Sequence, residues 1–336
     1  MIALDANGAD GGPALVAEGA RASGEEVLVF GAGLSGTDGR VQLVDAPSVE
    51  PGSNPVRAVR SQPQASIVQA AAAVADGRAE ALVSAGSTGP TLAAATLAIK
   101  RVKGVHRPAL AALVPIPAKP VLLLDAGANV EVRPEHLVQF AYMGAAFMEA
   151  VMGIERPSVG LLSVGEESGK GTPDVLEARE RLEGGALNFV GNLEGFDLPG
   201  AGADVVVSDG FTGNIALKVL EGTSRVVRDA IRDAVTSGPV SSAGGLLIRG
   251  AVGRLRDRID PEAVGGAILL GLRKPVVVGH GSFGPKGIAS AIRLARRAVD
   301  EDMVGRTAAA LEAAGAMRSA PVGTFAAVKP EIPDAG

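Results

Sequence analysis

The chain has 336 residues, of which 46 are Gly, 21 are Pro and none is Cys or Trp, and its formal net charge is −5. Without cysteine it can form no disulfide, thiolate nucleophile, Cys-ligated zinc site or iron–sulfur cluster. Its mild acidity argues against nucleic acid as a partner, because phosphate backbones select basic surfaces. The length and the 47% hydrophobic content predict one large or two medium folded domains.

The first residues, MIALDANGADGGP, lack the basic segment and apolar core of a signal peptide, which predicts a cytoplasmic protein. Residues 81–99 carry no charge and have the length of a membrane span. Because Ser, Thr, Gly and Pro occupy the middle of this stretch, we interpret it as a buried strand, a polar turn and a helix.

One unit recurs along the chain: a short apolar run, then a Gly-rich polar turn, then a helical pattern. Continuous apolar runs indicate parallel strands that are covered on both faces. The sequence therefore predicts an α/β fold with a doubly wound, mostly parallel sheet. The six clearest strands are residues 2–4, 81–83, 121–124, 159–164, 204–207 and 276–278.

Helices are expected where apolar residues recur with helical spacing, several of them after a proline. The segment SGPVSSAGG at 237–245 separates two such stretches, which predicts a projecting helical hairpin over about 211–260. We expect residues 1–316 to form a single α/β/α domain and 317–336 a flexible tail. The expected helices are 63–75, 90–100, 134–152, 211–235, about 246–258, and 286–300.

Polar side chains gather in the predicted turns. In open α/β sheets ligands bind beyond the carboxyl ends of the strands, where helix N-termini offer free N–H groups. This composition suits an oxyanion such as phosphate, although turn geometry alone also favours Gly, Asn and Asp. The residues concerned are Asp5, Asp10, Ser87, Thr88, Asp125, Asn129, Glu166, Lys170, Asp209, Asn214, His280 and Ser282.

Three segments resemble familiar functional motifs but are not interpreted as those motifs. The G-x-G-x-x-G at 31–36 is followed by a second strand-like run at 41–44 rather than a helix, so a dinucleotide site is not expected. The segment GEESGKG at 165–171 has the wrong spacing for a phosphate-binding loop and lacks the Ser or Thr that would hold Mg²⁺. The segment AGSTG at 85–89 resembles a nucleophile elbow, but an anion-binding hydroxyl at Ser87 is the preferred interpretation.

The chain has three histidines, and none forms a metal-binding pair at i, i+4. His106 and His136 are interpreted as structural. His280 lies between glycines after a predicted strand, so it is a candidate hydrogen-bond donor or general acid/base. We expect no metal and no cofactor.

Blocks from most of the chain resemble the PlsX-type acyl-acyl-carrier-protein:phosphate acyltransferases. They occur in the order found in that family and cover about residues 1–300. The main blocks are DANGAD at 5–10, PVRAVR at 55–60, SAGSTG at 84–89, LLLDAGAN at 122–129, VGLLSVGEE at 159–167, SDGFTGN at 208–214 and HGS at 280–282.

The resemblance implies a homodimeric three-layer α/β/α protein, related in fold to isopropylmalate dehydrogenases and phosphate acetyltransferases. It implies transfer of a fatty acyl group from acyl carrier protein to inorganic phosphate, giving an acyl phosphate for a membrane glycerol-3-phosphate acyltransferase in phospholipid synthesis. The family usually has Asn where Ser87 stands, which argues against Ser87 as a nucleophile. It usually has Met-Gly-Gly at 7–9 and often a polar residue at Phe283.

We therefore expect bound phosphate to attack the thioester directly, with no acyl-enzyme intermediate. Phosphate binding is assigned to Ser87, Thr88, Gly89 and Asn129, with Lys170 as the counter-charge. His280 and Asn214 would donate to the carbonyl or assist proton transfer, and Asp209 would orient one of them. Further site candidates are Asp5, Gly8, Asp10, Asp125, Glu166, Thr212 and Ser282.

The carrier protein is acidic, so a local basic surface is expected to bind it. The hairpin combines apolar residues at its expected tip with adjacent arginines, which fits contact with anionic lipid or the carrier. The alternative is that the apolar residues are buried in a dimer interface and the arginines are only solvated. The residues are Leu246, Leu247, Ile248, Arg249, Arg254, Arg256 and Arg258.

Two other functions remain open at this stage. One is a coenzyme A-dependent phosphate acetyltransferase, which would use acetyl-CoA in place of a long-chain acyl carrier protein. The other is a non-catalytic, membrane-docked scaffold that binds the acyl carrier. A dehydrogenase would fit the fold class, but fold does not fix function and no dinucleotide motif supports it.

Overall fold

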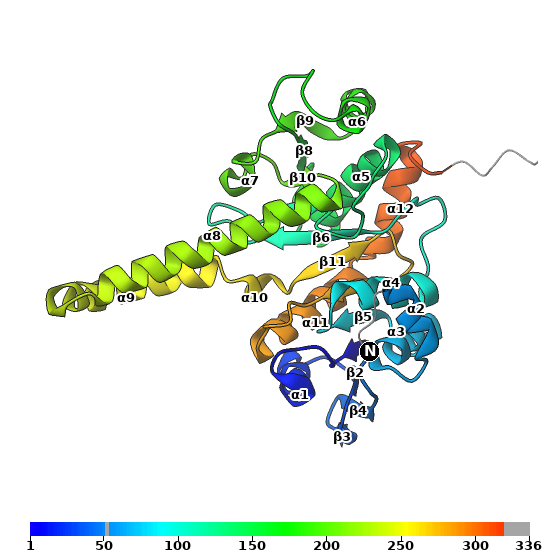
Figure 1. Ribbon diagram of the computed structural model, residues 1–336. Helices are drawn as coiled ribbons and strands as arrows, with labels where there is room; N and C mark the ends of the chain where they lie inside the picture. The colour runs from blue at the N-terminus through cyan, green and yellow to red at the C-terminus, as the bar shows by residue number, and fades with distance from the viewer. Residues whose placement is uncertain (51–53, 319–336) are drawn as a thin grey trace, which may run out of the picture.

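The structure, a computed structural model, describes residues 1–50 and 54–318. Twelve strands in this part of the chain form one sheet, in the order β3-β4-β2-β1-β5-β12-β11-β6-β7-β10-β8-β9 (Figure 1). Their bounds are β1 (Ile2–Asp5), β2 (Val27–Gly31), β3 (Gly36–Asp38), β4 (Val41–Asp45), β5 (Ala81–Ser84), β6 (Ala109–Val114), β7 (Val121–Leu124), β8 (Ser158–Leu162), β9 (Asn188–Leu193), β10 (Val205–Val207), β11 (Ala267–Leu270) and β12 (Val276–Val278).

The sheet consists of two parallel blocks that run in opposite directions. Strands β4, β2, β1, β5 and β12 pair in parallel, as do β7, β10, β8 and β9. Between the blocks, β11 pairs antiparallel with both β12 and β6, and β6 pairs antiparallel with β7. The carboxyl ends of the two blocks therefore lie at opposite edges of the sheet.

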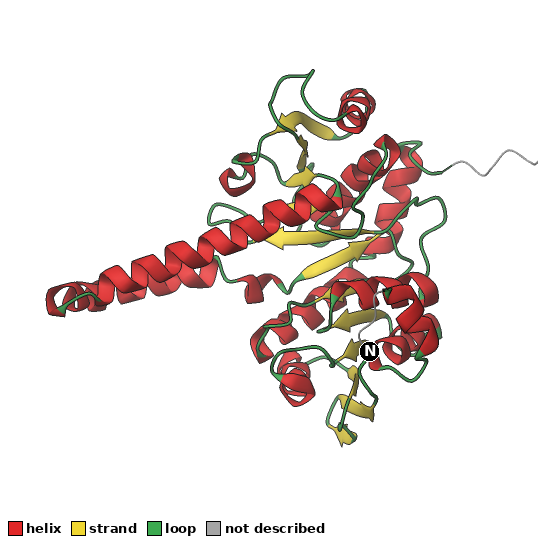
Figure 2. Cartoon of the chain, viewed as in Figure 1, coloured by secondary structure: helices red, strands yellow, loops and turns green. Residues whose placement is uncertain are grey.

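Helices cover both faces of the sheet, which gives three layers (Figure 2). One face packs against α1, α5, α6, α11 and α12, and the other against α2, α3, α4, α7 and α8. The helices are α1 (Gly12–Ser23), α2 (Pro55–Ser61), α3 (Ser66–Ala75), α4 (Thr88–Ala98), α5 (Pro134–Ala150), α6 (Pro173–Glu183), α7 (Asp197–Gly200), α8 (Gly210–Thr236), α9 (Pro239–Arg258), α10 (Pro261–Val264), α11 (Pro285–Asp300) and α12 (Met303–Ala313). The predicted fold class is confirmed.

Alternating side chains of the strands fill two apolar layers. Ile2 and Leu4 of β1 face one layer, whereas Ala3 faces the other, and all three are fully buried. Strands buried on both faces have to be apolar at consecutive positions, so they show no period-2 alternation. The stretch at 81–99 forms β5, a turn and α4, as predicted.

The structure bears on two features noted in the sequence, the G-x-G-x-x-G segment and the uncharged stretch with the length of a membrane span. After β2, the G-x-G-x-x-G segment leads into β3 and β4 instead of a helix, as expected for a sequence that is not a dinucleotide motif. No helix in the part of the chain that the structure covers is both long and apolar enough to cross a membrane.

The predicted hairpin projects from the body as α8 and α9 (Figure 1). At 27 residues, α8 is about 40 Å long. The expected start of the second arm, about residue 246, was wrong, because α9 begins at Pro239. Proline suits the first turn, where its missing N–H has no partner to lose, so only Ser237 and Gly238 interrupt the helices.

The tail was predicted to begin at residue 317. Met317 and Arg318 instead contact the body: the Arg318 amide donates to the Gly104 carbonyl at 2.7 Å, and Met317 lies against Gly104. The remainder of that segment, 319–336, lies outside the described residues.

Candidate functional site

Asp5 organises the turn that follows β1. Its buried carboxylate accepts hydrogen bonds from the Ser66 hydroxyl at 2.6 Å, the Ser84 hydroxyl at 2.8 Å and the Asn7 amide at 3.3 Å. Burial raises the pKa of Asp5 to about 6, and these donors oppose that rise. The carboxylate faces the protein interior, so its role here is to join β1, α3 and β5.

Asn7, which sequence reasoning did not single out, joins three further segments to the same turn. Its side-chain nitrogen donates to the Ala46 carbonyl and the Ser66 hydroxyl, and its oxygen accepts from the Ala32 amide. No local pattern could reveal this role, because these partners lie 25 to 59 residues away.

Gly8 lies where two turns touch. Its φ is +95°, and a Cβ at this position would lie 2.8 Å from the Cα of Gly86. Nearby, the Asp10 amide donates to the Gly281 carbonyl at 2.8 Å, which joins a third turn. The predicted candidates after β1, β5 and β12 are therefore brought together.

The N-terminus of α4 presents unsatisfied donors beside these turns. Ser87 stands at the N-cap, but its hydroxyl caps no amide; its carbonyl accepts from Thr91. Thr88 and Gly89 form the first turn, where backbone N–H groups have no intrahelical acceptor. This arrangement can bind an anion.

His280 adds a side-chain donor to the same edge. Its Nδ1 accepts from the Ser282 amide at 3.3 Å and lies 2.8 Å from the Ser282 hydroxyl. These contacts place the proton of neutral His280 on Nε2, and the side chain is exposed. Phe283 is buried 6.1 Å from the His280 ring, between Gly279 and Gly287, so it acts in packing.

At the other edge, Asp125 organises the turn after β7. Its fully buried carboxylate accepts five hydrogen bonds: from the amides of Leu110, Gly127, Ala128 and Asn129 and from the Asn129 side chain. Burial raises the pKa of Asp125, and its donors oppose the rise. The Asn129 side-chain nitrogen also donates to the Pro108 carbonyl at 2.8 Å, so it is committed to the turn.

The first turn of α8 packs directly on this turn. Asp209 is the N-cap and accepts from the Thr212 amide at 2.8 Å. The Gly210 amide donates to the Asn129 carbonyl, and a Cβ at Gly213 would overlap the Asp125 carbonyl. Asn214 is exposed, and its side chain lies beside Gly127.

Lys170 belongs to the loop between β8 and α6. Asn192 holds this loop through hydrogen bonds from its side-chain nitrogen to the carbonyls of Gly165, Glu167 and Lys170. Both Lys170 and Glu166 are exposed. The backbone is therefore fixed while the ammonium group remains accessible.

The site candidates thus form two groups, one at each edge of the sheet. No hydrogen bond among the described residues joins them. The sequence assigned Ser87, Thr88, Gly89, Asn129 and Lys170 to one phosphate site. The structure places the first three and the last two at opposite edges, because β11 and β6 reverse the strand direction. The α4 group is Asp5, Gly8, Asp10, Ser87, Thr88, Gly89, His280 and Ser282; the α8 group is Asp125, Asn129, Glu166, Lys170, Asp209, Thr212 and Asn214.

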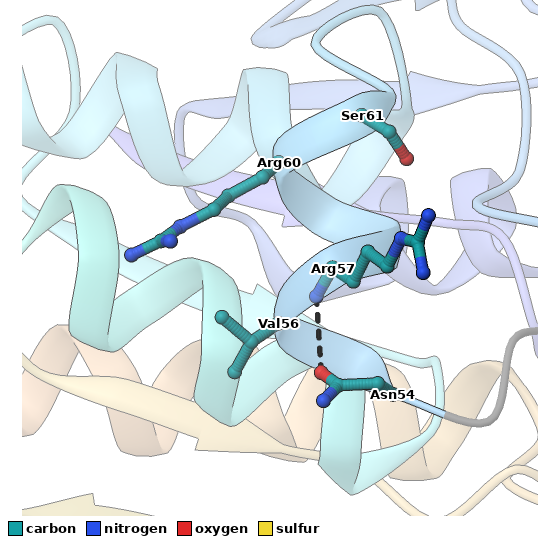
Figure 3. A pocket seen from close by; sticks show the side chains of 5 residues that line it. All are labelled: Asn54, Val56, Arg57, Arg60 and Ser61. Carbon is teal, nitrogen blue, oxygen red and sulfur yellow. Dashed lines mark hydrogen bonds between the residues drawn. The ribbon is translucent and has the colours of Figure 1, made fainter.

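Sequence reasoning assigned no role to two arginines of α2. Arg57 and Arg60 line a cavity of about 630 Å³ together with Asn54, Val56 and Ser61, and they extend to different sides of the helix (Figure 3). Helix α2 packs against α4, with Pro55 3.1 Å from the position of a Cβ on Gly89. The segment PVRAVR at 55–60, one of the blocks that resemble the family, is the sequence feature that could have pointed to these arginines.

One cluster has metal-ligand composition. His106, Glu135 and His136 have ligating atoms within 4.8 Å of one another. However, His136 Nδ1 accepts from the Arg133 amide, which places its proton on Nε2. Burial lowers the pKa of both histidines, and Arg101, Arg107 and Arg133 also lower these pKa values. The same arginines would repel a cation.

The hairpin places its apolar residues away from the tip. Leu246, Leu247 and Ile248 are 70, 89 and 48% exposed and lie in α9, beyond the Ser237–Gly238 connection. Arg249, Arg254, Arg256 and Arg258 follow on the same helix and are also exposed. The expectation that these apolar residues form the tip was wrong, because α9 begins earlier than predicted.

Comparison with known proteins gives the family. A family model described as "Fatty acid synthesis protein" matches residues 1–306. The chain belongs to this family. Two relatives named phosphate acyltransferase, from Anoxybacillus flavithermus and Elusimicrobium minutum, are each 42% identical to it over 315 and 320 residues. The alignments cover 90% of this chain and 96% and 93% of the relatives.

This chain shares its fold with solved phosphotransacetylases. The enzyme from Streptococcus pyogenes superposes with a TM-score of 0.58 at 20% identity, covering 89% of this chain and 94% of that one. At this identity the likeness concerns the fold alone. The resemblance drawn from sequence blocks is confirmed by the family match.

Proposed function

We propose that this chain transfers a fatty acyl group from the thioester of an acyl carrier protein to inorganic phosphate. The observation that carries the proposal is the 42% identity, over nine-tenths of the chain, to relatives named phosphate acyltransferase. The family description, fatty acid synthesis protein, supports an acyl carrier protein as the acyl donor.

The reaction proceeds by direct attack. A phosphate oxygen forms a bond to the thioester carbonyl carbon, the C–S bond breaks, and the leaving sulfur takes a proton. The chain has no cysteine to form an acyl-enzyme thioester, which supports a single transfer step. The protein then has to hold the phosphate, stabilise the oxyanion and orient both reactants.

The α4 group is the proposed phosphate site. Within residues 1–50 and 54–318, the amides of Thr88 and Gly89 and the Ser87 hydroxyl have no acceptor, and they lie at a helix N-terminus, where the helix dipole favours an anion. His280 Nε2 is the proposed donor to the carbonyl oxygen or the leaving sulfur.

Lys170 and Asn214 of the α8 group are proposed to complete the site. Helices α4 and α8 cover the same face, since Ala93, Ala128 and Leu217 pack in one apolar cluster. A sheet twists by about 20–25° per strand pair, so four steps from β5 to β7 rotate the strand direction by about 80–100°. Carboxyl ends that would point in opposite directions in a flat sheet are thereby brought to about a right angle to each other.

The decisive experiment incubates long-chain acyl carrier protein with the enzyme, with and without phosphate, and follows free thiol and acyl phosphate. Equal release of thiol and acyl phosphate, only when phosphate is present, supports the proposal. Carrier binding without thiol release indicates a scaffold. Activity confined to acetyl-CoA indicates a phosphate acetyltransferase.

Two substitutions test the site. We expect His280→Ala and Lys170→Ala each to reduce kcat/KM by about 10²-fold, the usual effect of losing one preorganised donor. Lys218→Ala, at an exposed lysine paired with Glu221 on α8, is the matched control. Activity within threefold of wild type in both site variants contradicts the assignment.

Further roles follow from the same family. We propose a homodimer that contacts anionic membrane through the hairpin and delivers acyl phosphate to a membrane glycerol-3-phosphate acyltransferase. The exposed Leu246 and Leu247 beside the α9 arginines support this proposal. Apolar side chains enter the interface of a bilayer while neighbouring arginines attract anionic headgroups.

A further inference from the structure

A second basic surface lies far from the hairpin in sequence, at the C-terminal end of α4. It combines cations from three segments: the end of α4 with its following loop, the β11–β12 connection, and the residues after α12. We call it the α4 basic surface; its members are Lys100, Arg101, Lys103, Arg273, Lys274 and Arg318. Four of them, Lys100, Arg101, Lys103 and Arg318, line a cavity of about 370 Å³ that no acidic residue of the described chain lines.

These cations are not neutralised locally. No ion pair joins any of the six to an acidic side chain within residues 1–50 and 54–318. The chain as a whole carries 37 acidic and 32 basic residues, so a six-cation cluster without acids contrasts with the rest of the sequence. All six side chains are exposed.

The backbone beneath this surface is fixed by hydrogen bonds between its segments. The Arg273 amide donates to the Lys100 carbonyl at 3.0 Å, and the Arg273 Nε donates to the Arg101 carbonyl at 3.1 Å. The Arg101 guanidinium donates to the His106 carbonyl, and the Arg318 amide to the Gly104 carbonyl. The charges are therefore held as a preformed surface.

Lys100 directly follows the C-cap of α4, and its amide donates to the Ala95 carbonyl at 3.1 Å. It has φ +69°, the left-handed conformation that glycine adopts most easily and that strains a lysine backbone. A cation near a helix C-terminus gains from the helix dipole, which accounts for Lys100 alone. It does not account for the cations that Arg273, Lys274 and Arg318 add from other elements.

The surface also lies close in the chain to the α8 group. Pro108, whose carbonyl accepts from Asn129, is the fourth residue after Gly104, which lies in the cavity wall. Four residues span at most about 14 Å. A macromolecule bound on this surface would therefore lie beside the turn that carries Asp125 and Asn129.

We propose that the α4 basic surface is the docking site for the acidic acyl carrier protein. This inference rests on the proposed function and replaces the hairpin arginines as the carrier-binding residues. Complementary charge raises the rate of encounter and fixes the orientation of a partner, and its effect falls as salt rises. The hairpin is then left to its proposed membrane role.

The test compares two triple variants with the same change in charge. One is Lys100→Glu, Lys103→Glu and Lys274→Glu; the control is Arg40→Glu, Arg225→Glu and Arg232→Glu, at exposed arginines elsewhere. Each is assayed with acyl carrier protein and with an acyl N-acetylcysteamine thioester, which has no carrier to dock. Carrier binding is also titrated directly, without phosphate, at low and high salt.

We expect the lysine variant to raise the KM for acyl carrier protein, and the Kd for the carrier, by about tenfold or more, with less salt dependence. Its turnover of the small thioester should match wild type, and the control should bind carrier as wild type does. Unchanged carrier binding overturns the inference, as does an equal effect in the control. A raised KM for phosphate with both acyl donors would instead indicate a site for a small anion and would also overturn it.

The test of the docking site can be distinguished from the test of the proposed acyl transfer. If wild type shows no phosphate-dependent thiol release with either donor, the proposed activity fails. The carrier titration then still decides whether the α4 basic surface binds the carrier.

Discussion

At the residue scale, two buried aspartates do the same structural work at opposite edges of the sheet. Asp5 accepts three hydrogen bonds and Asp125 accepts five. Each satisfies donors from separate segments and so fixes the turn that carries the exposed candidates. These donors oppose the cost of burying each carboxylate, although burial still raises both pKa values.

Replacing Asp5 with Asn should change the pH dependence of stability. The pKa of Asp5 is about 6 in the folded protein and 3.8 when exposed, so the folded state binds this proton more tightly than the unfolded state does. Its contribution therefore favours folding at low pH and is lost as the pH rises through about 4 to 6. The full loss is about 3 kcal/mol, at 1.36 kcal/mol per pKa unit.

Urea unfolding of wild type and Asp5→Asn at pH 4 to 8 measures this effect. The unfolding free energy of wild type minus that of the variant should fall by about 2–3 kcal/mol across the range. A difference that does not change with pH would show that Asp5 keeps the pKa of an exposed carboxyl.

The sequence predicted the positions of these residues but not their orientations. Asp5 and Asp125 follow apolar runs, so their places at strand ends could be expected. Whether each carboxylate faces inward depends on partners such as Ser66 and Ser84, which are 61 and 79 residues from Asp5. Pairings over that distance leave no local pattern.

At the element scale, the strands that sequence reasoning found are those followed by Gly-rich turns. Strand β6 is followed by Pro115-Ile116-Pro117 instead, and β11 pairs only with antiparallel neighbours. These two strands were missed, and they reverse the direction of the sheet. Without these strands, nothing in the sequence distinguished the edge that carries Ser87 from the edge that carries Asn129.

Two substitutions of Asp209 distinguish a helix-capping role for this residue from a catalytic one. As the N-cap of α8, it should tolerate Asn, which caps equally well, whereas Asp209→Ala should cost about 1 kcal/mol of stability. If Asp209 also orients a catalytic group, Asp209→Asn will keep wild-type stability and lose about tenfold or more in kcat. Urea unfolding and steady-state kinetics on the two variants measure both effects; full activity in Asp209→Asn leaves the cap as its role.

At the scale of the whole molecule, the body buries most of its apolar residues, whereas the hairpin exposes most of its own. No residue of α9 is buried, and Leu247 is 89% exposed. A large exposed apolar surface on a monomer marks an interface with a membrane or another chain. The sequence predicted the hairpin from the break near 237 but not which residues form its end.

Flotation with liposomes tests the membrane proposal. Wild type should float with vesicles that contain anionic lipid, and Leu247→Glu should reduce the bound fraction several-fold, because a charge replaces an inserting side chain. Val219→Glu, at an exposed position nearer the body on α8, is the control for added charge. Equal flotation of wild type and Leu247→Glu excludes α9 as the membrane contact. Sedimentation of both proteins reports whether Leu247 lies in a dimer interface.

The continuity of α8 has a mechanical consequence. Asn214 in its first turn and Thr236 at its far end belong to one uninterrupted helix, and 22 residues at 1.5 Å each separate them by about 33 Å. A helix of this kind is a rigid spacer. Any surface that binds the far end is therefore held at a fixed distance from the turn that carries Asp125 and Asn129.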